Sequence, residues 1–258
     1  MSNLLAGILF KFCQLILAFL HFAYSGLLYF DLAQNLIRRK LKKFFLQIQV
    51  LDSQVFVSNF VKELNKCPTH LVIIVGEDGI AFKDFSNIVI WCLAAKISFL
   101  SFYDYTGRLK NEQNNYYNYL IDKSKINPNY LSLASGKQNL KNGQKINCKI
   151  YLNFLSIEDG KRKFVELTKE ISKNVACNNI SISDINEQYI NNELFKLCGL
   201  PDPELVVISG TIYSSFGLLP WHIRVTEFLQ TISLKDIQIT DFVDILEKYS
   251  SCNQRFGK

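Results

Sequence analysis

Residues 71–79 read Leu-Val-Ile-Ile-Val-Gly-Glu-Asp-Gly, an unbroken apolar run followed by a short acidic loop between two glycines. A short run rich in β-branched residues is typical of a strand that is buried on both faces of a parallel sheet. The glycines end the strand and open a loop. Because loops at the carboxyl ends of parallel strands form the ligand sites of open α/β sheets, residues 76–79 are the first candidate site.

Strands and helices alternate on both sides of this stretch. Further strands are expected over residues 97–103, 146–154, 205–209 and 221–228. Helices are expected over residues 82–96, 111–123, 158–175, 183–197 and 241–249. Ser183-Asp184 and Thr240 are the expected caps of the last two helices, and Gly199 is the expected end of the first of these two. Residues 126–145 are rich in Asn, Ser, Gly and Lys and are expected to form an exposed loop. The alternation predicts an α/β domain with a parallel sheet built from right-handed βαβ units.

The N-terminal region has a different composition. Residues 12–30 contain no Asp, Glu, Lys or Arg. As a helix they would span roughly 28 Å, about the thickness of the hydrocarbon core of a bilayer. A cleaved signal peptide is the alternative, but it needs basic residues ahead of a shorter apolar core, and here the first basic residue is Lys11. We therefore expect an uncleaved N-terminal transmembrane helix within an anchor at residues 1–30.

Five cations follow the anchor, at Arg38, Arg39, Lys40, Lys42 and Lys43. By the positive-inside rule they place the rest of the chain in the cytosol. They define a basic juxtamembrane linker at residues 31–50, ahead of a single domain at residues 51–258. The net charge of the whole chain is only +6, which does not indicate nucleic-acid binding. Seven scattered cysteines without a C-x-x-C motif indicate reduced thiols and no metal site.

The residues by themselves leave the chemistry open. The loop at residues 76–79 is not a phosphate-binding glycine motif, so it is either a plain turn or a site in which Glu77 and Asp78 need a metal to accept phosphate. At the C-terminus, Arg255 offers a planar bidentate fork, and the backbone N–H of Gly257 can approach an anion without a side chain in the way. This tail is either a frayed end or a clamp for a diphosphate.

Three C-terminal segments carry a resemblance to a known family: PDPELVVISG at residues 201–210, FGLLPWHIRVTEF at residues 216–228 and DFVDILEKYSSCNQRFGK at residues 241–258. Residues 70–110 resemble the first βαβ unit of that family, and residues 155–171 fit its middle. From about residue 65 to its end, the chain resembles the Nogo-B receptor family, the accessory subunits of eukaryotic dehydrodolichyl diphosphate synthase. The anchor and the basic segment precede this region as they do in the family.

The resemblance implies the cis-prenyltransferase fold of undecaprenyl diphosphate synthase-like enzymes, a central, mostly parallel sheet ringed by helices. Catalytic members have a hydrophobic tunnel and condense isopentenyl diphosphate onto a growing allylic diphosphate. They carry D-G-N-G-R after the first strand and R-T-S-G-E-x-R after a late strand. Here the Asp and three of the arginines of these motifs are replaced, by Gly76, Ile80, Val207 and Tyr213. The chain alone is therefore expected to be inactive, because phosphate oxygens would be buried there without partners.

The resemblance further implies that Arg255 and Gly257 of the terminal R-x-G act within the active site of a catalytic partner subunit, as catalytic and substrate-binding residues. There Arg255 orients the diphosphate of isopentenyl diphosphate, and the Gly257 N–H donates to it. Mg²⁺ is expected to be held mainly by the partner, together with the diphosphates. The expected place is the endoplasmic reticulum membrane, crossed once, with contact to membrane lipid and with the domain in the cytosol. The expected product is the polyprenyl precursor of dolichol, which protein glycosylation requires.

Two alternatives stay open. One is a membrane-tethered receptor or scaffold with no role in prenyl transfer. The other is a self-sufficient enzyme that uses Glu77 or Asp78 in place of the missing Asp. The sequence indicates neither the length of the product nor the residues that contact a partner.

Overall fold

The computed structural model describes residues 10–27, 29–30, 34, 37, 53–77, 79–133 and 150–253. Contacts divide the chain into two units, Met1–Leu51 and Asp52–Lys258. In the first unit, Phe10–Leu27 is a helix of 18 exposed residues with a mean hydropathy of 1.3, long and apolar enough to cross a membrane. The basic segment at residues 38–43 lies outside the described residues.

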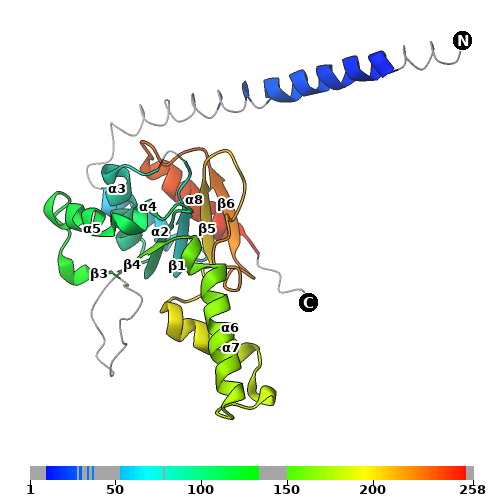
Figure 1. The fold of residues 1–258 in the computed structure, drawn as a ribbon. Helices are drawn as coiled ribbons and strands as arrows, with labels where there is room; N and C mark the ends of the chain where they lie inside the picture. Colours follow the sequence, from blue (N-terminus) through cyan, green and yellow to red (C-terminus); the bar gives the residue numbers. More distant parts are fainter. Residues whose placement is uncertain are drawn as a thin grey trace, which may run out of the picture. The chain divides into compact units, whose positions relative to one another are not determined.

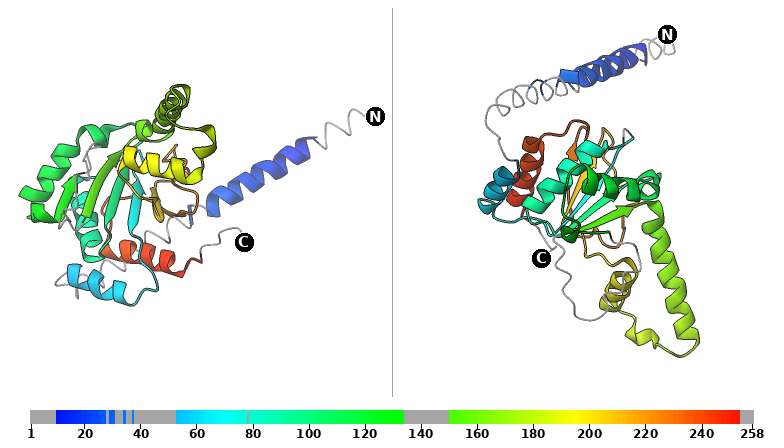
Figure 2. Two further views of the ribbon diagram at one scale, coloured as in Figure 1. Left: turned by 90° about the horizontal axis from the view of Figure 1, so that it is seen from below. Right: turned by 90° about the vertical axis from the view of Figure 1, so that its left-hand side faces the viewer.

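The second unit is an α/β domain (Figures 1 and 2). Its strands are β1 (His70–Ile74), β2 (Phe99–Tyr103), β3 (Leu131–Leu133), β4 (Ile150–Leu155), β5 (Leu205–Ser209) and β6 (Glu227–Thr231). They form one sheet in the order β3-β4-β2-β1-β5-β6. Every neighbouring pair is parallel, as the alternation of strands and helices predicts.

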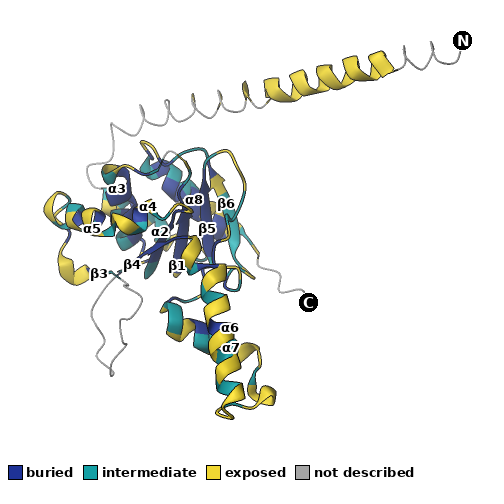
Figure 3. Cartoon of the chain, in the orientation of Figure 1, coloured by how far each residue is buried: buried dark blue, intermediate teal, exposed yellow. Residues whose placement is uncertain are grey.

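The helices of this unit are α2 (Ser53–Lys62), α3 (Phe82–Ala94), α4 (Arg108–Asn111), α5 (Gln113–Asp122), α6 (Lys161–Ala176), α7 (Glu187–Cys198) and α8 (Ile239–Ser251). Short 3-10 turns lie at η1 (Pro128–Tyr130), η2 (Ile157–Asp159) and η3 (Ile182–Asp184). In Figure 1, α6 and α7 lie side by side and reach away from the sheet, and Figure 3 shows that α6 is mostly exposed, whereas α7 is largely half-buried.

The strands send alternate side chains into two cores. Leu71 and Ile73 of β1 face the larger core, which helices α2, α3, α5 and α8 cover. Val72 and Ile74 of the same strand face a smaller core on the other side. A loop segment, not a helix, closes that smaller core, because Leu218 and Leu219 are buried in it.

The expected strand at residues 221–228 is wrong in its position. Trp221–Val225 forms a turn, and β6 begins only at Glu227. The apolar residues of this segment do not alternate along a strand. Instead, Leu219 takes a positive φ of 28° and turns the chain so that His222 is buried.

Two expected helix starts are also wrong. Helix α7 begins at Glu187, because Asn186 caps it by accepting from the Tyr189 N–H at 2.9 Å, while Ser183 and Asp184 belong to η3. Helix α8 begins before Thr240, and the Gln238 N–H donates to the Asp241 carboxylate at 3.0 Å in its first turn. The expected end of α7 at Gly199 is confirmed, with φ 67°.

The loop expected over residues 126–145 holds a short strand that the sequence did not reveal. Leu131–Leu133 pairs in parallel with β4 and forms one edge of the sheet. Residues 134–145 of this expected loop lie outside the described residues.

Candidate functional site

The loop after β1 sits against the end of β5. A Cβ atom placed on Gly76 would lie 2.5 Å from the Ser209 carbonyl oxygen, which belongs to the backbone and cannot turn away. Real Cβ atoms do not come this close to other heavy atoms, so the two chain segments touch only because residue 76 is glycine. No aspartate fits at this position unless the ends of both strands move apart.

The rest of the loop is a tight turn that presents few groups able to bind a phosphate. The Gly79 N–H donates to the Gly76 carbonyl at 3.1 Å, and Gly79 has a φ of 70°. Glu77 is exposed, and Asp78 lies outside the described residues. Ile80 is buried in the larger core, and its carbonyl accepts from the Tyr116 hydroxyl at 2.7 Å. The position where a catalytic relative would carry an arginine is thus a core position.

The end of β5 offers no cation either. Val207 is buried inside the strand, and Tyr213 is exposed, with its hydroxyl 3.5 Å from the Phe228 carbonyl oxygen. Between them, the Gly210 N–H donates to the Thr231 carbonyl at 3.0 Å, and the Gln230 side chain donates to the Gly210 carbonyl at 2.8 Å. The Gly210 N–H, a donor that an open anion site could present to its ligand, is therefore already used.

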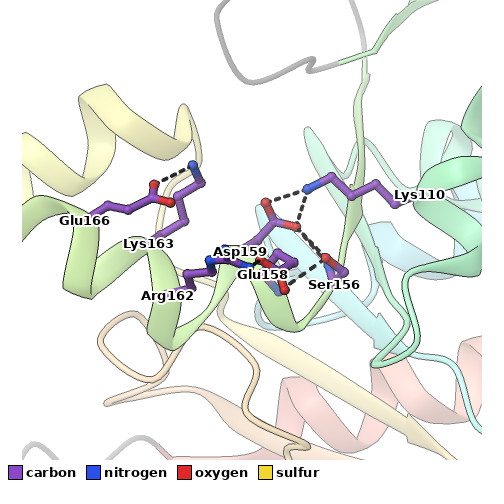
Figure 4. Close-up of polar contacts among 7 residues, drawn as sticks. All are labelled: Lys110, Ser156, Glu158, Asp159, Arg162, Lys163 and Glu166. Carbon is purple, nitrogen blue, oxygen red and sulfur yellow. Dashed lines mark hydrogen bonds and ion pairs between the residues drawn. The ribbon is translucent and has the colours of Figure 1, made fainter.

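Figure 4 shows polar contacts among residues of α4, the η2 turn with its cap Ser156, and α6. The Asp159 carboxylate accepts from the Ser156 N–H at 2.9 Å and from Lys110 Nζ at 2.6 Å. Arg162 is paired with Glu158, and Lys163 with Glu166 at 2.9 Å. Lys110, Arg162 and Lys163 therefore have acidic partners within the domain.

Aromatic rings fill the interior between α3, α5 and the sheet. The Phe85 ring lies 4.8 Å from both the Phe102 and the Tyr116 rings, centroid to centroid. Phe82 lies 4.4 Å from Tyr116, and Phe154 lies 5.7 Å from Phe85. Rings at these separations are in packing contact. This layer is therefore solid, and a prenyl chain would have to displace the rings to enter it.

Two histidines are buried and structural. His70 begins β1, at the opposite end of the strand from the Gly76 loop, and its ring nitrogens lie 2.8 Å from the Pro201 carbonyl oxygen and from the Ser101 hydroxyl. Burial lowers the pKa of His70 from 6.5 to about 4, partly offset by the Pro201 contact. Burial also lowers the pKa of His222. Both side chains are part of the buried interior.

The described part of the chain holds no cluster of metal-ligating side chains. No group of three or more His, Cys, Asp or Glu side chains in that part of the chain is placed to hold an ion. The six cysteines among the described residues carry free thiols. The predicted site residues Arg255 and Gly257 lie outside the described residues, so the structure does not test them.

Solved structures show which class of protein has this fold. The chain is similar to lavandulyl diphosphate synthase from Lavandula x intermedia, with a TM-score of 0.55 and 17% identity over 74% of this chain and 99% of that one. It is also similar to a probable undecaprenyl diphosphate synthase from Campylobacter jejuni, with a TM-score of 0.52 and 18% identity over 75% of this chain and 100% of that one. The domain therefore has the cis-prenyltransferase fold that its sequence predicts.

Relatives in sequence give the family within that class. The human dehydrodolichyl diphosphate synthase complex subunit NUS1 is 33% identical over 208 residues, 76% of this chain and 69% of the human protein. The subunit of the same name from Saccharomyces cerevisiae is 30% identical over 200 residues, 68% of this chain and 53% of the yeast protein. A scan against models of protein families finds no match. The chain belongs to the NUS1 family of dehydrodolichyl diphosphate synthase complex subunits.

Proposed function

We propose that this chain is the non-catalytic, membrane-tethered subunit of a heteromeric cis-prenyltransferase. The complex condenses isopentenyl diphosphate onto farnesyl diphosphate and makes the polyprenyl precursor of dolichol. The names of the NUS1 relatives, which describe subunits of such a complex, support this role. The observation that carries it is Gly76, where the fold leaves no room for the aspartate of a catalytic member.

Inactivity of the isolated chain follows from charge. Two diphosphates bring several negative charges into one pocket, and each unpaired phosphate oxygen loses hydrogen bonds that it makes in water. At the equivalent edge of this domain, Gly76, Ile80, Val207 and Tyr213 supply no charge. Lys110 and Lys163 are held by Asp159 and Glu166.

The terminal R-x-G is the part of this chain that serves the reaction. Arg255 reaches into the active site of the catalytic subunit and binds the diphosphate of isopentenyl diphosphate through its planar fork. The Gly257 N–H donates to the same group. Both residues belong to the sequence that follows α8, a helix anchored in the larger core by Phe242 and Leu246.

Mg²⁺ belongs with the partner and the diphosphates. The described residues of this chain do not form a set of ligands for it. In this proposal the domain contributes to the metal indirectly, by placing Arg255 beside the diphosphates that the metal binds.

The membrane helix gives the complex its location. Phe10–Leu27 crosses the endoplasmic reticulum membrane once, and the basic residues that follow keep the domain in the cytosol. A membrane site suits the reaction, because a long polyprenyl product is insoluble in water.

Reconstitution tests the proposed function. We expect the purified full chain, given farnesyl diphosphate, isopentenyl diphosphate and Mg²⁺, to form no elongated product. When it is added to the catalytic subunit, we expect it to raise the turnover of that subunit strongly. Elongation by the chain alone would instead support an enzyme that uses Glu77 or Asp78.

Removal of residues 253–258 separates the proposed role from that of a scaffold. The shortened chain should still assemble with the catalytic subunit, since α8 and the cores stay intact, but the complex should lose most of its turnover. Full turnover without the tail would favour the receptor or scaffold reading.

A further inference from the structure

The membrane-spanning helix has one polar side. Its residues with amide, imidazole, ammonium or aliphatic hydroxyl groups are Lys11, Gln14, His21 and Ser25. With Ala18 between them, they are spaced three, four, three and four residues apart. At 3.6 residues per turn, these five positions fall within an arc of about 80°, and no other residue of Phe10–Leu27 falls in that arc. We call this row the polar seam.

The rest of the helix surface is apolar or aromatic, apart from the thiol of Cys13 and the phenol of Tyr24. Every residue of the helix is exposed, including those of the seam. In the hydrocarbon core of a bilayer no water is available, so polar groups that face lipid are expensive. His21 lies within one turn of the middle of the span, where this penalty is largest. The seam therefore requires a partner inside the membrane.

We propose that the partner is a second copy of this helix, packed in parallel along the polar seam. This inference rests on the membrane span proposed above. The amide of Gln14, the imidazole of His21 and the hydroxyl of Ser25 each carry both a donor and an acceptor. When two copies enter the membrane in the same direction, equal residues meet at equal depth across a two-fold axis. Each of these groups then meets the same group of the second helix, which supplies the donor or acceptor that it needs.

The spacing of the seam fits this pairing. A repeat that averages 3.5 residues keeps one face of two helices in contact along a left-handed crossing. Ala18, the small residue at the centre, lets the two backbones approach. The seam from Lys11 to Ser25 is roughly 21 Å long, most of the hydrocarbon thickness. Lys11 is the second residue of Phe10–Leu27, so its ammonium group extends to the headgroups and avoids the Lys11 of the second helix.

The helix has two alanines on opposite sides, which provide a matched test. Ala18 is in the seam, and Ala23 lies about 160° from the centre of the seam at 3.6 residues per turn. Each is replaced by cysteine in the full chain with Cys13→Ser, co-expressed with its catalytic partner. Membranes are then treated with a mild oxidant, and the disulfide-linked product at twice the chain mass of 29.7 kDa is measured. The Cys13→Ser chain with neither cysteine added gives the background from the other thiols.

We expect Ala18→Cys to form at least about fivefold more of this product than Ala23→Cys, which should stay at background. Adding Gln14→Leu and His21→Leu should lower the Ala18→Cys product severalfold, whereas Leu17→Ala, off the seam, should not. Equal products from the two cysteines, or an adduct of Ala18→Cys with a different protein, would overturn the pairing.

Alkaline extraction of the same membranes separates the two proposals. A chain that is washed off the membrane refutes the span itself. A chain that resists extraction but forms no product through Ala18→Cys refutes only the pairing.

Discussion

Gly76 is the residue at which this domain departs most clearly from an active prenyltransferase. The missing carboxylate is not only a change of chemistry. The Ser209 carbonyl oxygen occupies the space that any Cβ would need. The position of the missing aspartate is therefore filled by backbone of β5. Sequence alone showed that the aspartate is absent, but it did not show that the space is gone, because Ser209 lies 133 residues further along the chain.

We predict that Gly76→Ala destabilises the domain, because the new methyl group must push two strand ends apart. Overpacking of this kind costs on the order of 1–3 kcal/mol. Denaturant unfolding of the full chain measures it. Gly79→Asn is the control, because that position has open space and asparagine tolerates a positive φ. Equal stability of Gly76→Ala and the unaltered chain would show that the two loops separate easily.

His70 should make stability depend on pH. Its pKa is about 4 in the folded chain, against 6.5 for the ordinary group, so the unfolded chain takes up a proton first as pH falls. The stabilisation is therefore complete above pH 6.5 and is lost as pH falls toward 4. Between pH 7.5 and 5 the loss should be about 2 kcal/mol. Denaturant unfolding at both pH values measures it.

His70→Asn serves as the matched variant for this prediction, because asparagine can bond to the same neighbours but does not titrate. It should be less stable at pH 7.5 and show a flatter pH dependence. If the free energy of unfolding depended on pH equally in both proteins, the effect would come from other groups. His222 is one such group, because its pKa is also lowered by burial.

Strands β1, β2, β4 and β5 and helices α3, α5 and α6 follow local pattern, and the sequence predicts them, whereas it does not predict β3 or α2. The run at residues 71–75 is β1 within one residue, and residues 82–96 contain α3. Errors occur where distant contacts set the geometry. The strand expected over residues 221–228 begins only at Glu227, and the segment Phe216–Leu219 ahead of it forms a strap over the smaller core. It is held by the Tyr103 hydroxyl, which donates to the Phe216 carbonyl at 2.6 Å across 113 residues of chain.

We predict that Tyr103→Phe loosens this strap. The Phe216 carbonyl would lose its partner, and Phe216 also has a positive φ of 48° that other contacts must maintain. The free energy of unfolding should fall by about 1–2 kcal/mol. Hydrogen exchange of the amides of Phe216–Leu219 should accelerate more than that of β1. Tyr105→Phe, at an exposed tyrosine nearby, should change neither quantity.

The chain joins an apolar helix that is long enough to cross a membrane to a domain that has the fold of an enzyme but lacks that enzyme's charged residues at Gly76, Ile80, Val207 and Tyr213. Composition was sufficient to indicate the helix, and the resemblance was sufficient to indicate the fold. The candidate site was predictable only as a set of missing residues. The aromatic packing of Phe82, Phe85 and Tyr116 that fills the interior comes from three-dimensional contacts, which no single segment reveals.

A glycosylation sequence in the domain can show on which side of the membrane the domain lies. Asn179-Ile180-Ser181 is an acceptor sequence for N-glycosylation, and Asn179 is exposed. If the domain is cytosolic, Asn179 should stay unmodified in membranes that glycosylate a sequon placed on an N-terminal extension of the same chain. A mobility shift that Asn179→Gln abolishes would place the domain in the lumen, and would favour the receptor reading.

The most direct test of the shared active site is kcat/KM for isopentenyl diphosphate in the reconstituted complex, measured with two variants of the tail. Arg255→Ala removes the proposed diphosphate ligand and should lower kcat/KM about tenfold or more. Lys258→Ala removes a neighbouring cation and should leave it within about twofold. Equal values for Arg255→Ala and the unaltered complex would contradict the claim that this chain completes its partner's site.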